Sequence, residues 1–211
     1  MQPDANFWNG IAQKYAQSPI GDMEAYQYTL GRTRSYLKTS DKVLELGCGT
    51  GSTAIELANA VGHITASDFA QTMLDIGAEK ASAQNVTNVD FLQLDASYHD
   101  AKSQFDVVMG FNLFHLVKDI DASFAEVHSR LKPGGLFISK TPCLSEPGLG
   151  FKFGLLKFAI PVMQFIGKAP FVRFLSVQEL DAAVAKAGFE IIEFGSFPKK
   201  PVSRYIVARK T

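Results

Sequence analysis

The sequence predicts a three-layer α/β fold built on a seven-stranded sheet that is mostly parallel, with one antiparallel edge strand. Apolar runs of strand length alternate with runs of helical periodicity, which is typical of βαβ units. No helical pattern separates the last two strands, so they are expected to pair as an antiparallel hairpin. The predicted strands cover residues 43–46, 62–68, 89–95, 105–111, 136–139, 189–194 and 203–209, and the helices between them cover 52–58, 70–84, 119–131 and 176–188.

Length and composition narrow the classes of protein. The 211 residues favour a single domain, 1–211, with a sizeable core. The 21 basic and 21 acidic residues cancel and form no basic stripe, so no nucleic-acid partner is expected. Cys48 and Cys143 are too few for a disulfide framework, and the N-terminus lacks a signal-peptide pattern, so a cytoplasmic location is expected. The most apolar window, Leu149–Ile166, contains two lysines and a proline, which argues against a membrane span.

Residues 1–40 precede the first predicted strand and are expected to form a helical leader. Apolar spacing through Ile11 and Tyr15 predicts a short helix, which Ser18–Gly21 interrupts. A second helix is expected to begin at Asp22.

The turn after the first strand is the organising feature, because Gly47, Gly49 and Gly51 stand at every second position in it. Without Cβ atoms the backbone turns sharply and a ligand can approach the main chain. The free N–H groups at the start of the following helix suit an electronegative group on that ligand.

Three classes of ligand use such a turn. No Lys or Arg lies between Val43 and Lys80, which argues against a phosphate loop. Gly49–Ala54 fits the G-x-G-x-x-A pattern of a dinucleotide site, and Asp68 lies near the expected distance for a ribose carboxylate. The third class is S-adenosylmethionine, which carries an adenosine with two free ribose hydroxyls.

Glu45–Gly51 resembles the first motif of class I S-adenosylmethionine-dependent methyltransferases. Asp68, the pair Asp95 and Ala96, and Leu131–Gly135 match later motifs in the family's order, and the resemblance covers most of the chain. The resemblance implies a Rossmann-like fold, S-adenosyl-L-methionine as cofactor and S-adenosyl-L-homocysteine as product. The nearest similarity is to the small-molecule branch, which includes quinone-type methyltransferases.

The resemblance also implies roles for residues at the first three strand ends. Asp68 is expected to accept hydrogen bonds from both ribose hydroxyls, and Asp95 with the Ala96 N–H to bind the adenine. The alternative for Asp95 is a cap on the turn that follows it. Phe69 is expected either against the adenine face or in the core. The motif residues expected to line the cofactor site are Glu45, Gly47, Cys48, Gly49 and Gly51.

The leader and the fourth strand supply the remaining candidates. Tyr15 lies in an Ile-Ala-x-x-Tyr setting that often closes over the cofactor in related methyltransferases, and packing of the leader is the alternative. The Phe111 carbonyl or Asn112 is expected to receive the cofactor's ammonium group. His115 is the candidate catalytic residue, ordering the substrate or acting as a base, with a structural role as the alternative.

The implied reaction is in-line displacement of the sulfonium methyl by a small apolar or aromatic acceptor. Placement and exclusion of water suffice for it, so no catalytic triad is required. The four histidines have no metal-ligand spacing, and no metal is expected. An NAD(P)-dependent oxidoreductase and a non-catalytic S-adenosylmethionine-binding protein stay open as alternatives.

Residues 142–170 are apolar and are interrupted early by proline and glycine. They follow the fifth strand, near the edge where ligands bind in such folds, and are expected to form a lid over the acceptor. Peripheral contact with a membrane is a further interpretation of this insertion. The sequence leaves the acceptor and the oligomeric state open.

Overall fold

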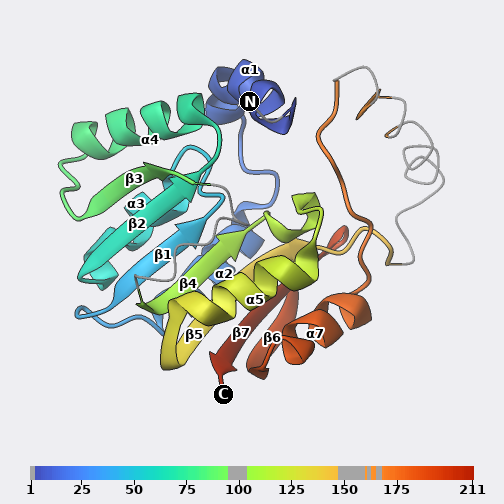
Figure 1. The fold of residues 1–211 in the computed structure, drawn as a ribbon. Coiled ribbons are helices and arrows are strands. Elements are labelled where there is room, and N and C mark those ends of the chain that lie inside the picture. The colour runs from blue at the N-terminus through green and yellow to red at the C-terminus, as the bar shows by residue number, and fades with distance from the viewer. Residues whose placement is uncertain (1–2, 95–103, 147–159, 161–162, 165–167) are drawn as a thin grey trace.

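A seven-stranded sheet forms the centre of the protein, which was obtained as a computed structural model (Figure 1). The structure describes residues 3–94, 104–146, 160, 163–164 and 168–211. The strand order is β3-β2-β1-β4-β5-β7-β6. The strands are β1 (Lys42–Leu46), β2 (His63–Asp68), β3 (Val89–Gln93), β4 (Phe105–Phe111), β5 (Leu131–Pro142), β6 (Phe189–Lys199) and β7 (Val202–Lys210).

Strand direction confirms the predicted fold class. The pairs β1–β2, β2–β3, β1–β4 and β4–β5 are parallel, whereas β7 runs antiparallel to both β5 and β6. The single reversed strand, β7, therefore lies one place in from the edge strand β6, and the two form the predicted hairpin.

Helices cover both faces of the sheet (Figure 1). In Figure 1, α5 and α7 lie in front of the sheet, and α2 and α3 lie behind it. The first helix packs against α4, which lies over β2 and β3. The helices are α1 (Pro3–Gln17), α2 (Met23–Arg34), α3 (Ser52–Leu57), α4 (Gln71–Ala83), α5 (Ile120–Arg130) and α7 (Val177–Lys186), with short 3-10 turns η1 (Ala58–Ala60) and η2 (Phe114–Leu116).

Side-chain caps fix where several of these helices begin. The Asp22 carboxylate accepts the Ala25 N–H at 2.9 Å, so α2 begins where the sequence predicts. Ser176 and Glu179 form the predicted capping box at the start of α7. That helix ends before Gly188, whose φ of +88° lies in the left-handed region that favours glycine.

The segment Leu131–Gly135 differs from its prediction as a helix-to-strand turn. Strand β5 already begins at Leu131, which pairs with Phe105 of β4. The register then shifts between Phe105 and Val107, because Gly134 takes a φ of +74° and lets the strand continue through the bend. The segment thus extends the sheet as well as ending α5.

Two apolar clusters hold the layers together. Phe114, Phe124 and Phe137 form one tilted and two edge-on ring pairs in the cluster under α5 and α7. Leu30 and Leu57 belong to the cluster under α2 and α3. Because both faces are filled, polar groups collect at the carboxyl ends of the parallel strands, where the connections to the helices begin.

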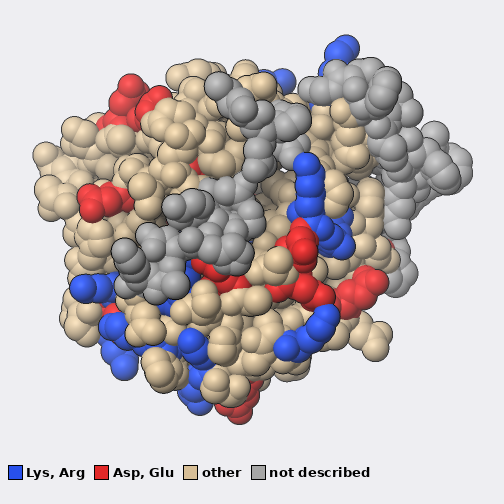
Figure 2. Space-filling view, in the orientation of Figure 1, with Lys and Arg blue, Asp and Glu red and all other residues tan. Residues whose placement is uncertain are grey.

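The surface of the described residues carries both signs of charge. On the face shown in Figure 2, acidic and basic side chains are spread over several elements. Within the described ranges, no helix is both long enough and apolar enough to cross a membrane.

Candidate active site at the carboxyl edge of the sheet

The glycine turn between β1 and α3 is tightly packed on one side and open on the other. Gly51 has a φ of +69°, and a Cβ built there would lie 2.5 Å from the Phe91 ring. Gly49 has a φ of +54°, and the nearest atom to a Cβ at that position would be a Tyr15 ring carbon at 3.7 Å. Gly51 therefore serves packing, whereas Gly49 exposes backbone beneath Tyr15, where a ligand can approach.

Asp68, at the end of β2, is held rigidly by backbone donors. Its Oδ2 accepts the Gly49 N–H and its Oδ1 accepts the Ala70 N–H, both at 2.9 Å. Burial raises the pKa of this carboxyl, while the N–H donors of Ala70, Gly49 and Phe69 oppose the rise. The carboxylate thus joins the glycine turn to the start of α4, and each oxygen keeps a lone pair for a further donor.

Glu45 of β1 is buried, and one of its two carboxyl oxygens has no hydrogen-bond partner among the described residues. Its carboxylate accepts the Ala54 N–H at the start of α3, but among the described residues Oε2 has no hydrogen-bond partner. Burial raises the pKa of Glu45 to about 8, and the nearby charge of Asp68 adds to the rise. A buried carboxylate oxygen without a donor is unusual, and a cationic group of a ligand would satisfy it.

Helix α1 covers this turn with aromatic residues. The Trp8 and Tyr15 rings meet edge-on, with centroids 6.0 Å apart. Burial raises the pKa of the Tyr15 hydroxyl, and the charges of Asp68 and Glu45 raise it further. Phe69 packs with Trp8 onto a small cluster between α1 and α4. Trp8 and Phe69 therefore tie α1 to the domain, and Tyr15 lies over Gly49.

The end of β4 borders the same edge. The Asn112 backbone has a φ of +54°, and its N–H donates to the Lys140 carbonyl of β5 at 2.7 Å. Phe111, one residue earlier, is half-buried and pairs with Lys140 in the sheet register. The chain therefore turns out of the sheet at the level of the glycine turn, as a ligand-bordering loop requires.

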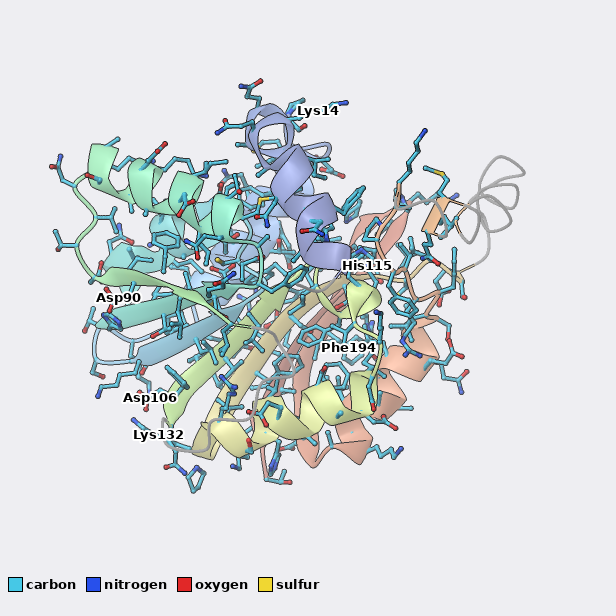
Figure 3. All side chains as sticks on the ribbon, turned by 45° about the horizontal axis from the view of Figure 1, so that its top comes forward. Lys14, Asp90, Asp106, His115, Lys132 and Phe194 are labelled. Carbon is cyan, nitrogen blue, oxygen red and sulfur yellow. The ribbon has the colours of Figure 1, made fainter. Side chains whose placement is uncertain are left out.

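His115 lies in η2, just beyond this turn, at the carboxyl end of the strands (Figure 3). Its Nδ1 is buried and has no hydrogen-bond partner among the described residues. Burial lowers the pKa of the imidazole to about 4, so the ring is neutral at pH 7. A neutral ring with an unpartnered nitrogen can form a hydrogen bond with a ligand, although it is a weak base.

Sequence reasoning missed Lys140, a buried cation near the end of β5. Its Nζ lies 3.5 Å from the Thr29 hydroxyl and 6.0 Å from the centroid of the Tyr26 ring. Burial lowers the pKa of the ammonium, and the charge of Asp22 opposes this. The only signal in the sequence was a lysine ending the apolar run that begins at Leu136.

Two predicted features cannot be placed. Asp95 and Ala96, the predicted adenine contacts, lie outside the described residues, as does most of the predicted lid at 142–170. Among the residues that the structure does describe, no three His, Cys, Asp or Glu side chains lie together as a metal site.

Comparisons with known proteins agree with this geometry. The sequence matches the methyltransferase domain family over residues 43–135. The demethylmenaquinone methyltransferase of Staphylococcus carnosus is 31% identical over 185 residues, which cover 76% of this chain and 73% of that protein. The demethylmenaquinone methyltransferase of Staphylococcus aureus strain Newman is 32% identical over 183 residues, with the same two coverages.

Solved structures share the fold. A DhpI–SAH complex superposes with a TM-score of 0.74 at 21% identity, covering 99% of this chain and 95% of that chain. The [4+2]-cyclase SpnF has a TM-score of 0.71 at 20% identity, covering 88% and 80%. A cyclase on this fold shows that fold alone does not define the reaction, so the sequence relatives decide the family. On their identity and coverage, this chain belongs to the class I S-adenosylmethionine-dependent methyltransferases.

Proposed function

We propose that this enzyme methylates a small aromatic acceptor of the hydroquinone type. The observation that carries the proposal is a continuous polar edge: the open backbone at Gly49, the fixed carboxylate of Asp68 and the unpartnered oxygen of Glu45 lie around one turn. A cofactor with a nucleoside at one end and an ammonium group at the other matches this order of groups.

In the proposed complex the ribose hydroxyls donate to Asp68, whose two oxygens are already aligned by backbone N–H groups. The ammonium group donates to Glu45 Oε2 and to the Phe111 carbonyl or the Asn112 side chain. Tyr15 covers the cofactor where its ring lies over Gly49. The adenine lies beside Phe69, with Asp95 and Ala96 as its polar contacts, as the family resemblance implies.

The chain's contribution to catalysis is placement. When bound, S-adenosylmethionine supplies a methyl group on a sulfonium leaving group. The aromatic cover of α1 and the apolar clusters beneath the turn exclude water from the reacting atoms. His115, with a neutral ring and a buried free Nδ1, orders the acceptor by a hydrogen bond to its hydroxyl.

The class of acceptor follows from the relatives and from carbon chemistry. Two relatives whose alignments cover 76% of this chain, at 31% and 32% identity, are demethylmenaquinone methyltransferases. A quinone ring carbon is electrophilic, so a quinone-type acceptor must enter as the hydroquinone. The ring carbon then bonds to the methyl group, the sulfur keeps the electron pair of the broken bond, and the ring carbon loses its proton.

A transfer assay tests this proposal. Purified enzyme is incubated with S-adenosylmethionine and a short-chain demethylmenaquinone reduced with dithionite, and the products are analysed by mass spectrometry. The expected result is a methylated acceptor and an equal amount of S-adenosylhomocysteine. If S-adenosylhomocysteine binds but no hydroquinone, phenol or amine in a panel is methylated, the chain is a cofactor-binding protein without transferase activity. Titration with NADH is the negative control.

A further inference from the structure

Lys140 is a buried cation whose neighbours in the described part of the chain are all neutral or distant. The residue is 8% exposed. Its nearest polar neighbour is the Thr29 hydroxyl at 3.5 Å, which itself donates to the Ala25 carbonyl at 2.9 Å. The Tyr26 ring, at 6.0 Å, contributes a weak cation–π contact. Neither neighbour supplies the negative charge that a buried ammonium group needs.

The other buried cations of the described chain are treated differently. Arg130 donates to the Glu126 carboxylate at 2.7 Å, and Arg204 donates to the Asp181 carboxylate at 3.0 Å. Each buried guanidinium therefore has a carboxylate, whereas no carboxylate of the described residues lies within ion-pairing distance of the Lys140 ammonium. An uncompensated buried charge destabilises a fold, so its retention points to a role in binding.

Lys140 lies on the acceptor side of the candidate site. In the sheet register it pairs with Phe111, and its carbonyl holds the Asn112 N–H. Lys140 lies two residues after Ile138, which packs in the cluster under α2 and α3, so both side chains leave the sheet on that face. Glu45 lies two residues after Val43, which packs in the same cluster, so Glu45 is on that face too. Glu45 belongs to β1, and β4 separates β1 from β5. A ligand that reaches past the end of β4 therefore meets Lys140 after it has passed Glu45.

Tyr26 lies between Glu45 and Lys140. Its hydroxyl lies close to Thr53 at the start of α3 and to the Glu45 carboxyl group, and its ring faces the Lys140 ammonium. The α2 face of the edge thus carries a carboxyl group at β1, which a bound cation would ionise, an aromatic ring in the middle and a cation at β5. This order suits a cofactor cation at one end and an acceptor anion at the other.

We propose that the ammonium group of Lys140 binds an ionised oxygen of the methyl acceptor, so that the enzyme selects acceptors with an acidic phenolic or enolic hydroxyl beside the methylated position. The inference rests on the proposed function and narrows its acceptor. An oxyanion of the acceptor supplies the negative charge that no described residue provides to the Lys140 ammonium. The pairing also keeps the acceptor ionised, the form in which its ring is most electron-rich.

The cofactor's carboxylate is the one other anion that shares this chemistry. The proposed cofactor contacts lie on α1 and at the carboxyl ends of β1 to β4, whereas Lys140 lies on β5, one strand further along the sheet. We therefore assign Lys140 to the acceptor, and cofactor affinity separates the two sources.

Binding of a coloured naphtholate tests the assignment without requiring turnover. The probe is 2-nitro-1-naphthol, which is ionised at neutral pH, titrated by absorbance into the enzyme saturated with S-adenosylhomocysteine. The variants are Lys140→Met, which keeps the length of the side chain, and Lys140→Gln. Lys132→Met is the matched control: Lys132 lies on the same strand at the opposite edge of the sheet, half exposed and paired with Asp106 at 2.6 Å (Figure 3).

The expected result is a naphtholate Kd raised about tenfold or more in both Lys140 variants, as for loss of a charged hydrogen bond. The Kd stays unchanged in Lys132→Met, and S-adenosylhomocysteine affinity stays unchanged in all three. Lys140→Met should also unfold at the same or a higher temperature, because it removes a buried charge; a purely structural lysine would give a lower temperature.

Three results would overturn the inference: no naphtholate binding by the unaltered enzyme, equal binding by Lys140→Met, or a large loss of S-adenosylhomocysteine affinity. The last result would mean that Lys140 binds the carboxylate of the cofactor. The two proposals fail separately. Naphtholate binding that depends on Lys140, without methylation of the hydroquinone, keeps Lys140 and removes the quinone-type acceptor. Methylation of the hydroquinone at an unchanged rate in Lys140→Met keeps the quinone-type acceptor and removes the role of Lys140.

Discussion

The two halves of the carboxyl edge are built by different means. At the ends of β1 and β2, backbone donors fix the polar groups: Asp68 accepts two N–H groups, and Glu45 caps α3. At the ends of β4 and β5, His115 and Lys140 are single side chains buried with little or no polar support. The first half is a rigid cradle suited to an invariant cofactor, whereas the second can change its acceptor by changing one or two side chains.

The largest expected effect breaks the cradle itself. Gly49→Val should abolish S-adenosylhomocysteine binding, because the new side chain occupies the space between the turn and Tyr15. Its left-handed backbone, at a φ of +54°, should also cost about 1–2 kcal/mol of unfolding free energy. Calorimetric titration and urea unfolding measure the two effects.

Gly134→Val is the control for this substitution. Gly134 has a φ of +74° and open space where a Cβ would lie, so valine adds the same backbone strain far from the turn. It should lower stability similarly and leave cofactor affinity intact. Normal affinity in Gly49→Val would show that the ligand does not approach the backbone there.

The pH dependence of stability tests the burial of Glu45. Its pKa is about 8 in the folded protein against 4.5 for an ordinary glutamate, so between pH 5 and 8 the unfolded chain ionises first and binds fewer protons. The unliganded enzyme should therefore lose roughly 4 kcal/mol of unfolding free energy across that interval from this group.

Glu45→Gln should remove most of that loss, as urea unfolding at pH 5, 6.5 and 8 would show. Bound cofactor favours the ionised carboxylate through its ammonium group, so binding at pH 7 should release a proton. Calorimetry in buffers of different ionisation enthalpy detects this release. An unchanged pH slope in Glu45→Gln would assign the slope to other groups.

Removal of the proposed ribose ligand should have a smaller effect. Asp68→Ala should weaken S-adenosylhomocysteine binding by about 1.5–3 kcal/mol, the range for hydrogen bonds to a charged group. Asp75→Ala is the control, because Asp75 is exposed on α4 and its carboxylate accepts a hydrogen bond from the Gln71 side chain. Unchanged affinity in Asp68→Ala would mean that the ribose binds elsewhere.

His115→Ala should have the smallest effect and should act on the other half. Loss of one neutral hydrogen bond to the acceptor should lower turnover about tenfold, with cofactor affinity intact. Because the pKa of His115 is about 4, its contribution should be constant between pH 5 and 8.

The matched variant is His63→Ala, since His63 lies at the start of β2 beside Asp90, 3.3 Å away, at the opposite edge of the sheet. Full activity in His115→Ala would make His115 structural.

The same contrast explains what the sequence could predict. The strands, the capping box and the Asp68 carboxylate follow from local spacing, because alternation and helix caps are set by neighbouring residues. The antiparallel pairing of β6 with β7 also follows, since no helical pattern separates these two strands. Among them, Asp68 and the strands β1 and β2 belong to the cofactor half.

The acceptor half depends on packing between distant segments. Lys140 is buried only because α2, more than a hundred residues earlier, covers it with Thr29. The unpartnered oxygen of Glu45 likewise exists because α3 satisfies only one side of its carboxylate. Local pattern contains neither fact. A lysine after an apolar run predicts a strand end, and an acid within a motif predicts a ligand without showing which atom is free.

The measurement that tests the division most directly is calorimetric titration of S-adenosylhomocysteine into the unaltered enzyme, Asp68→Ala and Lys140→Met. If the edge has separate cofactor and acceptor halves, the unaltered enzyme and Lys140→Met bind with equal affinity and Asp68→Ala binds about tenfold or more weakly. Loss of affinity in Lys140→Met with normal binding in Asp68→Ala would contradict the division, because the cofactor would then bind at the ends of β4 and β5.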